Sequence, residues 1–211
     1  MNPKEIKAII FDVGGVLQLP KHSEKTKHDI GIHQTLAKRF KRNIDSWFDA
    51  IDTPYGKSMD GTISKEETIL ELTKNLNISQ SKLIKTLNKT YKKFYKKNKK
   101  LYKIAHKLKK QEYKIGIISD QWHLSKDILM PKKDIKQFNP IIVSCDPKVK
   151  LRKPNIKIYN LLIKKIKLKP NQILFIDNRQ YNLKPAKKLG IKTLLFKDNK
   201  QTIKELNKLI K

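Results

Sequence analysis

The chain has few of the residues that stabilise secreted, fibrous or disordered proteins. It has 211 residues and one cysteine, Cys145, so no disulfide can form within the chain. The fold therefore does not depend on an oxidising compartment. Nine prolines and seven glycines are too few for a fibrous or disordered chain, and 38% hydrophobic residues suffice for a folded globule. This length allows one large core, or a core with a smaller inserted cap.

Long hydrophobic runs are also missing. Residues 1–7 lead directly into a strand-like segment, without an apolar stretch long enough for a signal peptide or a membrane span. We therefore expect a cytoplasmic protein with no membrane partner, and nothing in the sequence indicates its oligomeric state. Cys145 follows an apolar run and has no histidine near it in sequence, so we expect a half-buried strand residue rather than a nucleophile.

Acidic residues are scarce, with 19 Asp and Glu against 49 Lys and Arg, which gives a formal net charge of +30. Such a charge suggests nucleic-acid binding. However, only four of the basic residues are arginines, and the lysines are spread along the whole chain. Readers of phosphate and guanine use the planar, bidentate arginine side chain. We therefore expect no specific nucleic-acid partner, and only salt-sensitive, non-specific binding to polyanions.

Five short apolar runs predict strands that are buried on both faces of a parallel sheet. They are Ala8–Phe11, Ile115–Ile118, Ile141–Ser144, Ile173–Ile176 and Thr193–Phe196. Stretches with helical spacing of apolar residues lie before the second run, between the later runs and after the last one. They are Leu101–Lys110, Lys157–Lys167, Leu183–Leu189 and Thr202–Ile210. This alternation predicts a doubly wound α/β domain.

The interval between the first and second predicted strands is too long for one crossover, and it has helical character throughout. The expected helices are Ile32–Phe48, Ser64–Leu76 and Ser79–Tyr95. Ser64 and Glu67 have the spacing of a capping box, and we expect turns at Gly56, Asp60 and Gly61. The predicted organisation is an α/β core of residues 1–17 and 100–211, with a helical cap of residues 18–99 inserted into it.

Two acidic residues directly follow predicted strands. Asp12 follows the first strand and precedes Gly14 and Gly15, and Asp177 with Asn178 ends the fourth. Ligands of open α/β sheets bind at the carboxyl ends of the strands. Two carboxylates that meet there suit a hard, oxygen-seeking cation such as Mg²⁺. The alternative for Asp12 is an ordinary aspartate in a turn.

Two further motifs lie at the ends of the second and third strands. The hydroxyl of Ser119, with the main chain around Asp120, suits a phosphoryl oxygen. Lys153 precedes Pro154, which fits the first turn of a helix. A fixed ammonium at this position would balance phosphoryl and aspartate charge. Each motif alone is weak, because serine after a strand and lysine in this chain are both common.

In order, spacing and strand context, these four motifs resemble the haloacid dehalogenase superfamily, in the branch whose helical cap follows the first strand. The resemblance covers essentially the whole chain. It implies a Rossmann-like five-stranded parallel sheet, with the strands in the order fifth, fourth, first, second, third. It also implies an Mg²⁺-dependent phosphatase that hydrolyses a small phosphorylated metabolite through an aspartyl-phosphate.

The resemblance also implies a role for each motif. Asp12 would be the nucleophile, and Ser119, Asp120 and Lys153 would bind the phosphoryl group, with Lys153 neutralising its charge. The Mg²⁺ ligands would be Asp12, the main-chain carbonyl of Gly14, Asp177 and, through water, Asn178.

The chain departs from the family pattern at two positions. Most phosphatases of the family have an aspartate at the position of Gly14, which protonates the leaving oxygen and later activates water. Its absence predicts a slow enzyme, or a substrate with a good leaving group such as a sugar 1-phosphate or an acyl phosphate. Asn178 replaces a second common aspartate.

Several side chains could compensate for these departures. Asp120 and three histidines could replace the missing proton shuttle, although a structural role is more common for each of them. The histidines are His28, His33 and His123, and the aromatic residues that could contact substrate are Trp47, Tyr55 and Trp122.

Two other functions remain open at this stage. One is a 2-haloacid dehalogenase, which also lacks the second aspartate and needs no metal, although such enzymes generally replace the acids corresponding to Asp177. The other is a catalytically weak protein that binds phosphate or polyanions, which the missing acids and the charge of +30 would favour.

Overall fold

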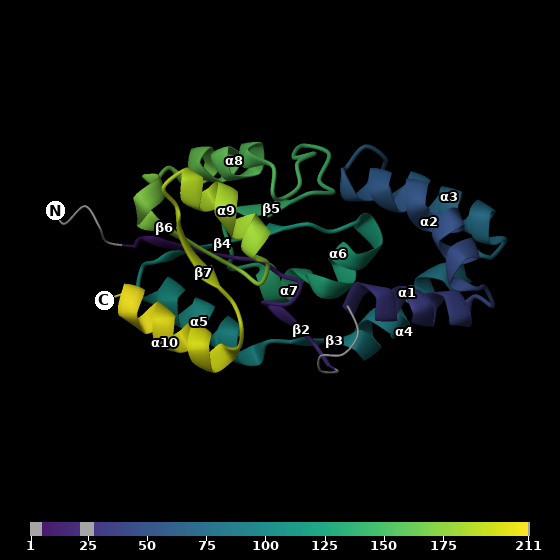
Figure 1. Cartoon of the computed structure of the whole chain (residues 1–211), viewed down its shortest axis with the longest axis horizontal. Coiled ribbons are helices and arrows are strands. Elements are labelled where there is room, and N and C mark those ends of the chain that lie inside the picture. The colour runs from purple at the N-terminus through teal and green to yellow at the C-terminus, as the bar shows by residue number, and fades with distance from the viewer. Residues whose placement is uncertain (1–5, 22–27, 211) are drawn as a thin grey trace.

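The computed structural model describes residues 6–21 and 28–210 and contains a five-stranded parallel sheet (Figure 1). The strands of this sheet are β1 (Ala8–Phe11), β4 (Lys114–Ser119), β5 (Ile141–Val143), β6 (Ile173–Asp177) and β7 (Lys192–Leu195). Their spatial order is β5-β4-β1-β6-β7, and all neighbouring pairs are parallel. This is the strand order that the resemblance implied, so the expected fold class is confirmed.

Helices cover both faces of the sheet because successive strand residues point to opposite sides. Ala8 and Ile10 belong to one apolar cluster, whereas Ile9 and Phe11 belong to the other. The first cluster includes residues of α8 (Ile156–Ile166) and α9 (Gln180–Lys188). The second includes residues of α5 (Lys99–Lys110) and α10 (Asn199–Leu209). Figure 1 accordingly shows α8 and α9 on one side of the sheet and α5 and α10 on the other.

A helical unit follows β1 and lies at one end of the molecule, beyond the sheet (Figure 1). It consists of α1 (His28–Arg39), α2 (Ile44–Met59), α3 (Lys65–Leu76) and α4 (Gln80–Phe94). A short antiparallel ribbon, β2 (Gln18–Pro20) with β3 (Tyr95–Lys97), lies where the chain enters and leaves this unit. The domain boundaries at residues 18 and 99 stay a prediction, and the ribbon lies close to both of them.

The first expected helix of this unit, Ile32–Phe48, is wrong as a single element. The chain turns at Lys41, which has a φ of +56°. Asn43 then caps the next helix, because its side chain accepts a hydrogen bond from the Ser46 amide at 2.7 Å. This local cap chemistry divides one apolar pattern into α1 and α2.

The other boundary predictions have mixed outcomes. The capping box of Ser64 and Glu67 is confirmed at the start of α3. Gly56 does not lie in a turn but inside α2. Pro154 lies before α8 rather than in its first turn, because Asn155 caps that helix. Cys145 lies beyond the end of β5 and is fully buried, and this burial raises the pKa of its thiol to about 11.

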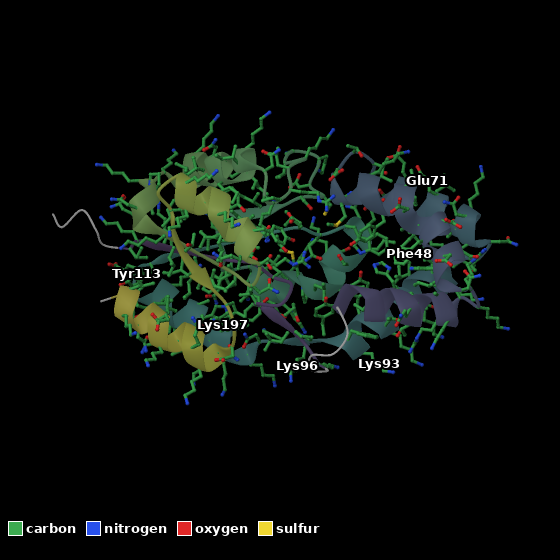
Figure 2. All side chains as sticks on the ribbon, in the orientation of Figure 1. Phe48, Glu71, Lys93, Lys96, Tyr113 and Lys197 are labelled. Carbon is green, nitrogen blue, oxygen red and sulfur yellow. The ribbon has the colours of Figure 1, made fainter. Side chains whose placement is uncertain are left out.

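Three short helical segments complete the described chain. They are α6 (His123–Leu129), α7 (Lys132–Ile135) and the 3-10 helix η1 (Pro170–Gln172). Within residues 6–21 and 28–210, every helix is too short or too polar to cross a lipid bilayer. Figure 2 shows long nitrogen-tipped side chains around the whole outline of the molecule, in agreement with lysines spread along the sequence.

We predict that Gly116→Ala, in the middle of β4, destabilises the protein. A Cβ at this position would lie 2.8 Å from the Pro140 carbonyl oxygen and 2.8 Å from Ile10 Cδ1. The expected loss in the free energy of unfolding is about 1–3 kcal/mol, the usual range for overpacking. Urea denaturation followed by circular dichroism measures this loss.

Gly56→Ala is the matched control. Nothing lies within 4 Å of a Cβ at this helical position, so the substitution should stabilise the protein by about 0.5–1 kcal/mol. Equal effects of the two substitutions would contradict the packing described around β4.

Candidate active site

A buried ammonium joins two carboxylates at the carboxyl edge of the sheet. Lys153 Nζ lies 2.7 Å from Asp12 Oδ1 and 2.7 Å from Asp177 Oδ2. The side chains are 2%, 9% and 0% exposed for Lys153, Asp12 and Asp177, respectively. Lys153 is 141 positions from Asp12 and 24 positions from Asp177 in the chain. The contact brings together three of the four sequence motifs.

The sheet register places the two carboxylates side by side. Phe11 of β1 pairs with Ile176 of β6, so the next residue of each strand is an aspartate. The Asp12 amide donates to the Ile176 carbonyl at 2.9 Å, which extends the ladder to the aspartate itself. Because parallel strands end at the same edge, both carboxylates lie there.

Asp120 holds the segment that carries the lysine. Lys153 lies in the loop between β5 and α8, and its amide donates to Asp120 Oδ1 at 3.1 Å. Asp120 directly follows β4 and is half-buried, and burial raises its pKa. Asp120 therefore contacts the main chain of Lys153, while the side chain of Lys153 extends to the ends of β1 and β6.

The electrostatics of this cluster follow from its burial. Burial raises the pKa of Asp12 to about 6, the Asp177 charge adds to this rise, and Lys153 opposes it. Burial lowers the pKa of Lys153, but Asp12, Asp177 and Asp120 outweigh that effect and hold the pKa above its ordinary value. The lysine is therefore charged throughout the physiological range. One ammonium among three carboxylates leaves the ionised site net negative.

Asp177 is fixed by groups from α9 and from the loop before it. The Arg179 amide donates to Asp177 Oδ1 at 2.8 Å, and Asn182 Nδ2 donates to Asp177 Oδ2 at 3.0 Å. Tyr159 donates to the main-chain carbonyl of Asn182. Asn182 Oδ1 is buried and has no hydrogen-bond partner among the described residues. An unsatisfied acceptor of this kind fits a site that receives a further group.

The donor atoms at this edge suit a hard divalent cation. The site has two buried carboxylates, a net negative charge and the unsatisfied oxygen of Asn182. Among the described residues, no three His, Cys, Asp or Glu side chains form a metal cluster by themselves. A bound cation would therefore also need amide, main-chain and water oxygens, which Mg²⁺ commonly uses.

The two glycines after Asp12 have different surroundings. A Cβ on Gly14 would meet nothing within 4 Å. A Cβ on Gly15, which has a φ of +84°, would lie 2.2 Å from Asn178 Nδ2. Gly15 is therefore required by its conformation and by the close approach of Asn178, whereas the position of Gly14 has room for a side chain.

These residues line a cavity of about 840 Å³ that lies between the sheet edge and the helical unit. The predicted site residues on its wall are Asp12, Gly14, Asp120, Lys153 and Asn178. The helical unit contributes His33, Tyr55 and Tyr91, among others. The cavity therefore has a charged end and a wall contributed by helices.

Ser119 lies beneath this surface. It is fully buried, and its hydroxyl accepts a hydrogen bond from Gln121 Nε2 at 3.1 Å. Gln121 in turn accepts from the Ser125 hydroxyl at 2.6 Å, and its amide donates to Ser144 Oγ at 3.0 Å. Phosphoryl binding by Ser119 stays a prediction, because Gln121 lines the cavity and Ser119 does not.

The candidate histidines lie in different places. His33 lines the cavity, and its Nδ1 accepts from Trp47 Nε1 at 3.0 Å. His123 Nε2 lies 3.0 Å from the Ile63 carbonyl oxygen, and burial lowers the pKa of this histidine. The side chain of His28 lies outside the described residues. Trp47 is buried and stacks on Phe40, which indicates a packing role.

Sequence reasoning missed Gln121, Asn182 and Arg179 as parts of the site. Asn182 follows Asp177 by five residues, and that spacing was the one available indication that its side chain could return to the strand end. The chain has four arginines, and two of them, Arg152 and Arg179, line the cavity. Arg152 also pairs with Asp60 at 3.2 Å, between the loop of Lys153 and the turn after α2.

The model of the haloacid dehalogenase-like hydrolase family matches residues 9–196 of this chain. Among curated proteins, the mouse bifunctional epoxide hydrolase 2 is 38% identical over 74 residues, and the rat protein is 32% identical over 102 residues. These alignments cover 35% and 44% of this chain, but only 13% and 17% of the relatives.

Solved structures show the same fold. A predicted hydrolase of this family from Porphyromonas gingivalis has a TM-score of 0.73 at 21% identity, with 97% of each chain covered. A family enzyme from Bacteroides thetaiotaomicron has a TM-score of 0.71 at 21% identity, with 92% of this chain and 95% of that chain covered. The Bacteroides enzyme has also been solved in complex with magnesium and inorganic phosphate.

We predict that Lys153→Met strongly destabilises the protein, because it leaves two carboxylates buried without their cation. The expected loss in the free energy of unfolding is about 3–5 kcal/mol. Adding Asp177→Asn should recover part of this loss. Chemical denaturation of both variants measures the two effects.

The matched control is Lys65→Met. Lys65 pairs with Asp127 at 2.5 Å, but the two side chains are 41% and 62% exposed. Such exposed pairs contribute within about 1 kcal/mol. A loss as small for Lys153→Met as for Lys65→Met would show that the buried pairs do not stabilise the fold.

We also predict a pH-dependent difference between the wild type and Asp12→Asn. Below the ordinary pKa of 3.8, Asp12 is protonated in both folded and unfolded chains. Between about pH 3.8 and about pH 6, the unfolded chain has released this proton while the folded protein still holds it, so the folded state loses stability as pH rises through this window. The wild type should therefore lose on the order of 3 kcal/mol relative to the variant between about pH 3.5 and about pH 7.5.

Urea denaturation across this range, with EDTA present to remove divalent cations, measures the difference. Titrating groups outside the cluster of Asp12, Asp120, Lys153 and Asp177 are shared by the two proteins and cancel. A difference that does not change with pH would show that the pKa of Asp12 is not raised.

Proposed function

Because this chain belongs to the haloacid dehalogenase-like hydrolase family, we propose that it is an Mg²⁺-dependent phosphatase acting on a small phosphorylated metabolite. The observation that carries this proposal is the buried contact of Lys153 with Asp12 and Asp177 at the carboxyl edge of the sheet. A structural relative that binds both magnesium and inorganic phosphate supports it.

Asp12 is the nucleophile of the proposed reaction. Its carboxylate attacks phosphorus and forms an aspartyl-phosphate, and water then releases inorganic phosphate. The ammonium of Lys153 favours the ionised form of Asp12 and neutralises charge that the phosphoryl group brings. Asp120 positions Lys153 through its main-chain amide.

Asp12, Asp177, the Gly14 carbonyl and Asn178 are the residues that would hold Mg²⁺. When bound, the ion supplies positive charge that offsets the repulsion between the carboxylates and the phosphoryl group. Arg179 and Asn182 fix the orientation of Asp177.

The dehalogenase alternative has less support, because Asp177 is present and is bonded by three groups of the site. Chloride release from 2-chloropropionate would favour it. The binding-protein alternative would be favoured by a gel shift with nucleic acid that persists at moderately high salt. The expected cytoplasmic location also stays a prediction.

The first test of the proposed function is phosphate release from a panel of phosphate esters, with Mg²⁺ and with EDTA. We predict that Asp12→Asn and EDTA each abolish release. Phosphate release that continues unchanged in Asp12→Asn would contradict the mechanism.

Gly14→Asp tests the missing proton shuttle. Gly14 lines the cavity, and nothing lies within 4 Å of a Cβ at this position. A general acid typically contributes about 10²- to 10⁴-fold. We predict that kcat on an alkyl phosphate such as glycerol phosphate rises by about 10²-fold.

Gly15→Asp is the control for this substitution. Its side chain would collide with Asn178, and its backbone has a positive φ. It should lower stability and give no gain in rate. A Gly14→Asp variant that folds and has an unchanged rate would show that the missing acid does not limit the enzyme.

A further inference from the structure

The cavity extends well beyond the charged cluster. Its volume of about 840 Å³ falls in the range of about 300–1,000 Å³ that holds drug-sized ligands. A phosphoryl group would occupy only the end beside Asp12 and Lys153. The rest of the cavity is therefore available to the organic part of a substrate.

Aromatic and apolar side chains contribute much of the cavity wall. Its aromatic and apolar residues are Ile32, Tyr55, Met59, Tyr91, Tyr95, Trp122 and Leu129. The rings of Tyr55 and Trp122 have centroids 5.1 Å apart, and Tyr91 and Tyr95 are nearly parallel, with an angle of 15° between them. Trp122 Nε1 donates to the Tyr91 hydroxyl at 2.9 Å, which fixes both rings. A fixed aromatic wall favours a flat ring as its ligand.

Several polar groups near this wall already bond one another. Gln121 accepts from Ser125 and donates to Ser119, and the Trp122 indole is bonded to Tyr91. A sugar would bury several hydroxyl groups here, and each of them would need a partner. An aromatic ring has no such requirement, so these contacts favour a ring over a sugar.

Gly14 also favours a substrate whose leaving oxygen is attached to an aromatic ring. The position that would protonate a leaving oxygen has no side chain, and the space beside it is open. A phenol ionises near pH 10, whereas water, which resembles an alkyl alcohol in this respect, ionises near pH 15.7. An aryl oxide therefore leaves readily without a general acid, whereas an alkyl oxide leaves slowly.

Building on the phosphatase function proposed above, we propose that the substrate is an aryl phosphate, a phosphate monoester whose ester oxygen is bonded to an aromatic ring. The ring lies against the wall formed by Tyr55 and its neighbours, and the phosphoryl group lies at Asp12 and Lys153. Arg152 and Arg179 also line the cavity, and they precede Lys153 and follow Asn178 in the sequence, respectively.

The reaction balances without a general acid. In the first step a bond forms between the Asp12 carboxylate oxygen and phosphorus, and the bond from phosphorus to the aryl oxygen breaks. The aryl oxide leaves with the electron pair and takes a proton from solvent water. In the second step water bonds to phosphorus, the bond to Asp12 breaks, and the proton of water passes to solvent.

Gly14 also provides no base to activate water in the second step, the hydrolysis of the aspartyl-phosphate. With a good leaving group the first step is fast, so hydrolysis of the aspartyl-phosphate limits turnover. We therefore expect a rapid burst of about one phenol per chain, followed by slower steady release.

Kinetics with the Mg²⁺-loaded protein test the leaving group. Phenyl phosphate, benzyl phosphate and glucose 1-phosphate are compared, because benzyl phosphate keeps the ring but has an alkyl leaving oxygen. We expect kcat/KM for phenyl phosphate to exceed that for benzyl phosphate by about 10²-fold or more, since only the latter needs the missing acid. Gly14→Asp should narrow this gap.

Binding tests the aromatic wall independently of chemistry. Phenylphosphonate and methylphosphonate are compared as ligands of the wild type by calorimetry, with Mg²⁺ present. We expect phenylphosphonate to bind more tightly and Tyr55→Leu to weaken its binding by about 2- to 12-fold, with little change for methylphosphonate. Tyr113→Leu is the matched control, because Figure 2 places Tyr113 at the opposite end of the molecule from Phe48 of α2.

The outcomes separate the two proposals. If glucose 1-phosphate is the best substrate, if phenylphosphonate binds no better than methylphosphonate, or if Tyr55→Leu behaves as Tyr113→Leu, the aryl assignment is wrong and the phosphatase function stands. If no ester in the panel releases phosphate with Mg²⁺, the phosphatase function itself is wrong.

Discussion

The ammonium of Lys153 is the interaction on which the rest of the site depends. Without it, Asp12 and Asp177 would be two buried carboxylates on neighbouring strands, and their repulsion would oppose folding. With it, the sheet edge carries a compact, buried cluster that is net negative. Asp120 holds the lysine loop, and Asn182 with Arg179 holds Asp177, so each charged group has a partner that fixes its position.

The helical unit completes the cavity whose charged end this cluster forms. Tyr55 of α2 and Tyr91 of α4 face the sheet edge across the cavity, and Trp122 connects the two parts because it lies just after β4 and bonds Tyr91. The core thus supplies charge, and the helices supply an apolar surface. Gly14 provides no side chain that could act as a general acid at the charged end. It also leaves open space beside Asp12.

Much of the fold could be predicted from local pattern. The apolar runs around Ile10 and Phe175 mark strands because buried parallel strands need apolar side chains on both faces, and Ser64 with Glu67 marks a helix start because both bonds are local. Predictions of helix boundaries failed where a single turn residue, a cap or tertiary packing sets the boundary. The split after Arg39 depends on one turn residue and a cap, and Gly56 is helical because neighbouring α2 residues bury their side chains.

The sequence by itself determined the strand ends that carry Asp12, Ser119 and Asp177, because a motif at a strand end requires only the local order of residues. It also determined that position 14 is a glycine, which cannot act as a general acid. Only the tertiary structure decided that Lys153 lies between the two carboxylates, that Asn182 returns to Asp177, and that aromatic rings face the charged cluster. The contact of Lys153 with Asp12 joins residues 141 positions apart, and its geometry depends on strand register and loop paths that local composition does not encode. The return of Asn182 to Asp177 spans only five residues, but it depends on the path of the loop between β6 and α9.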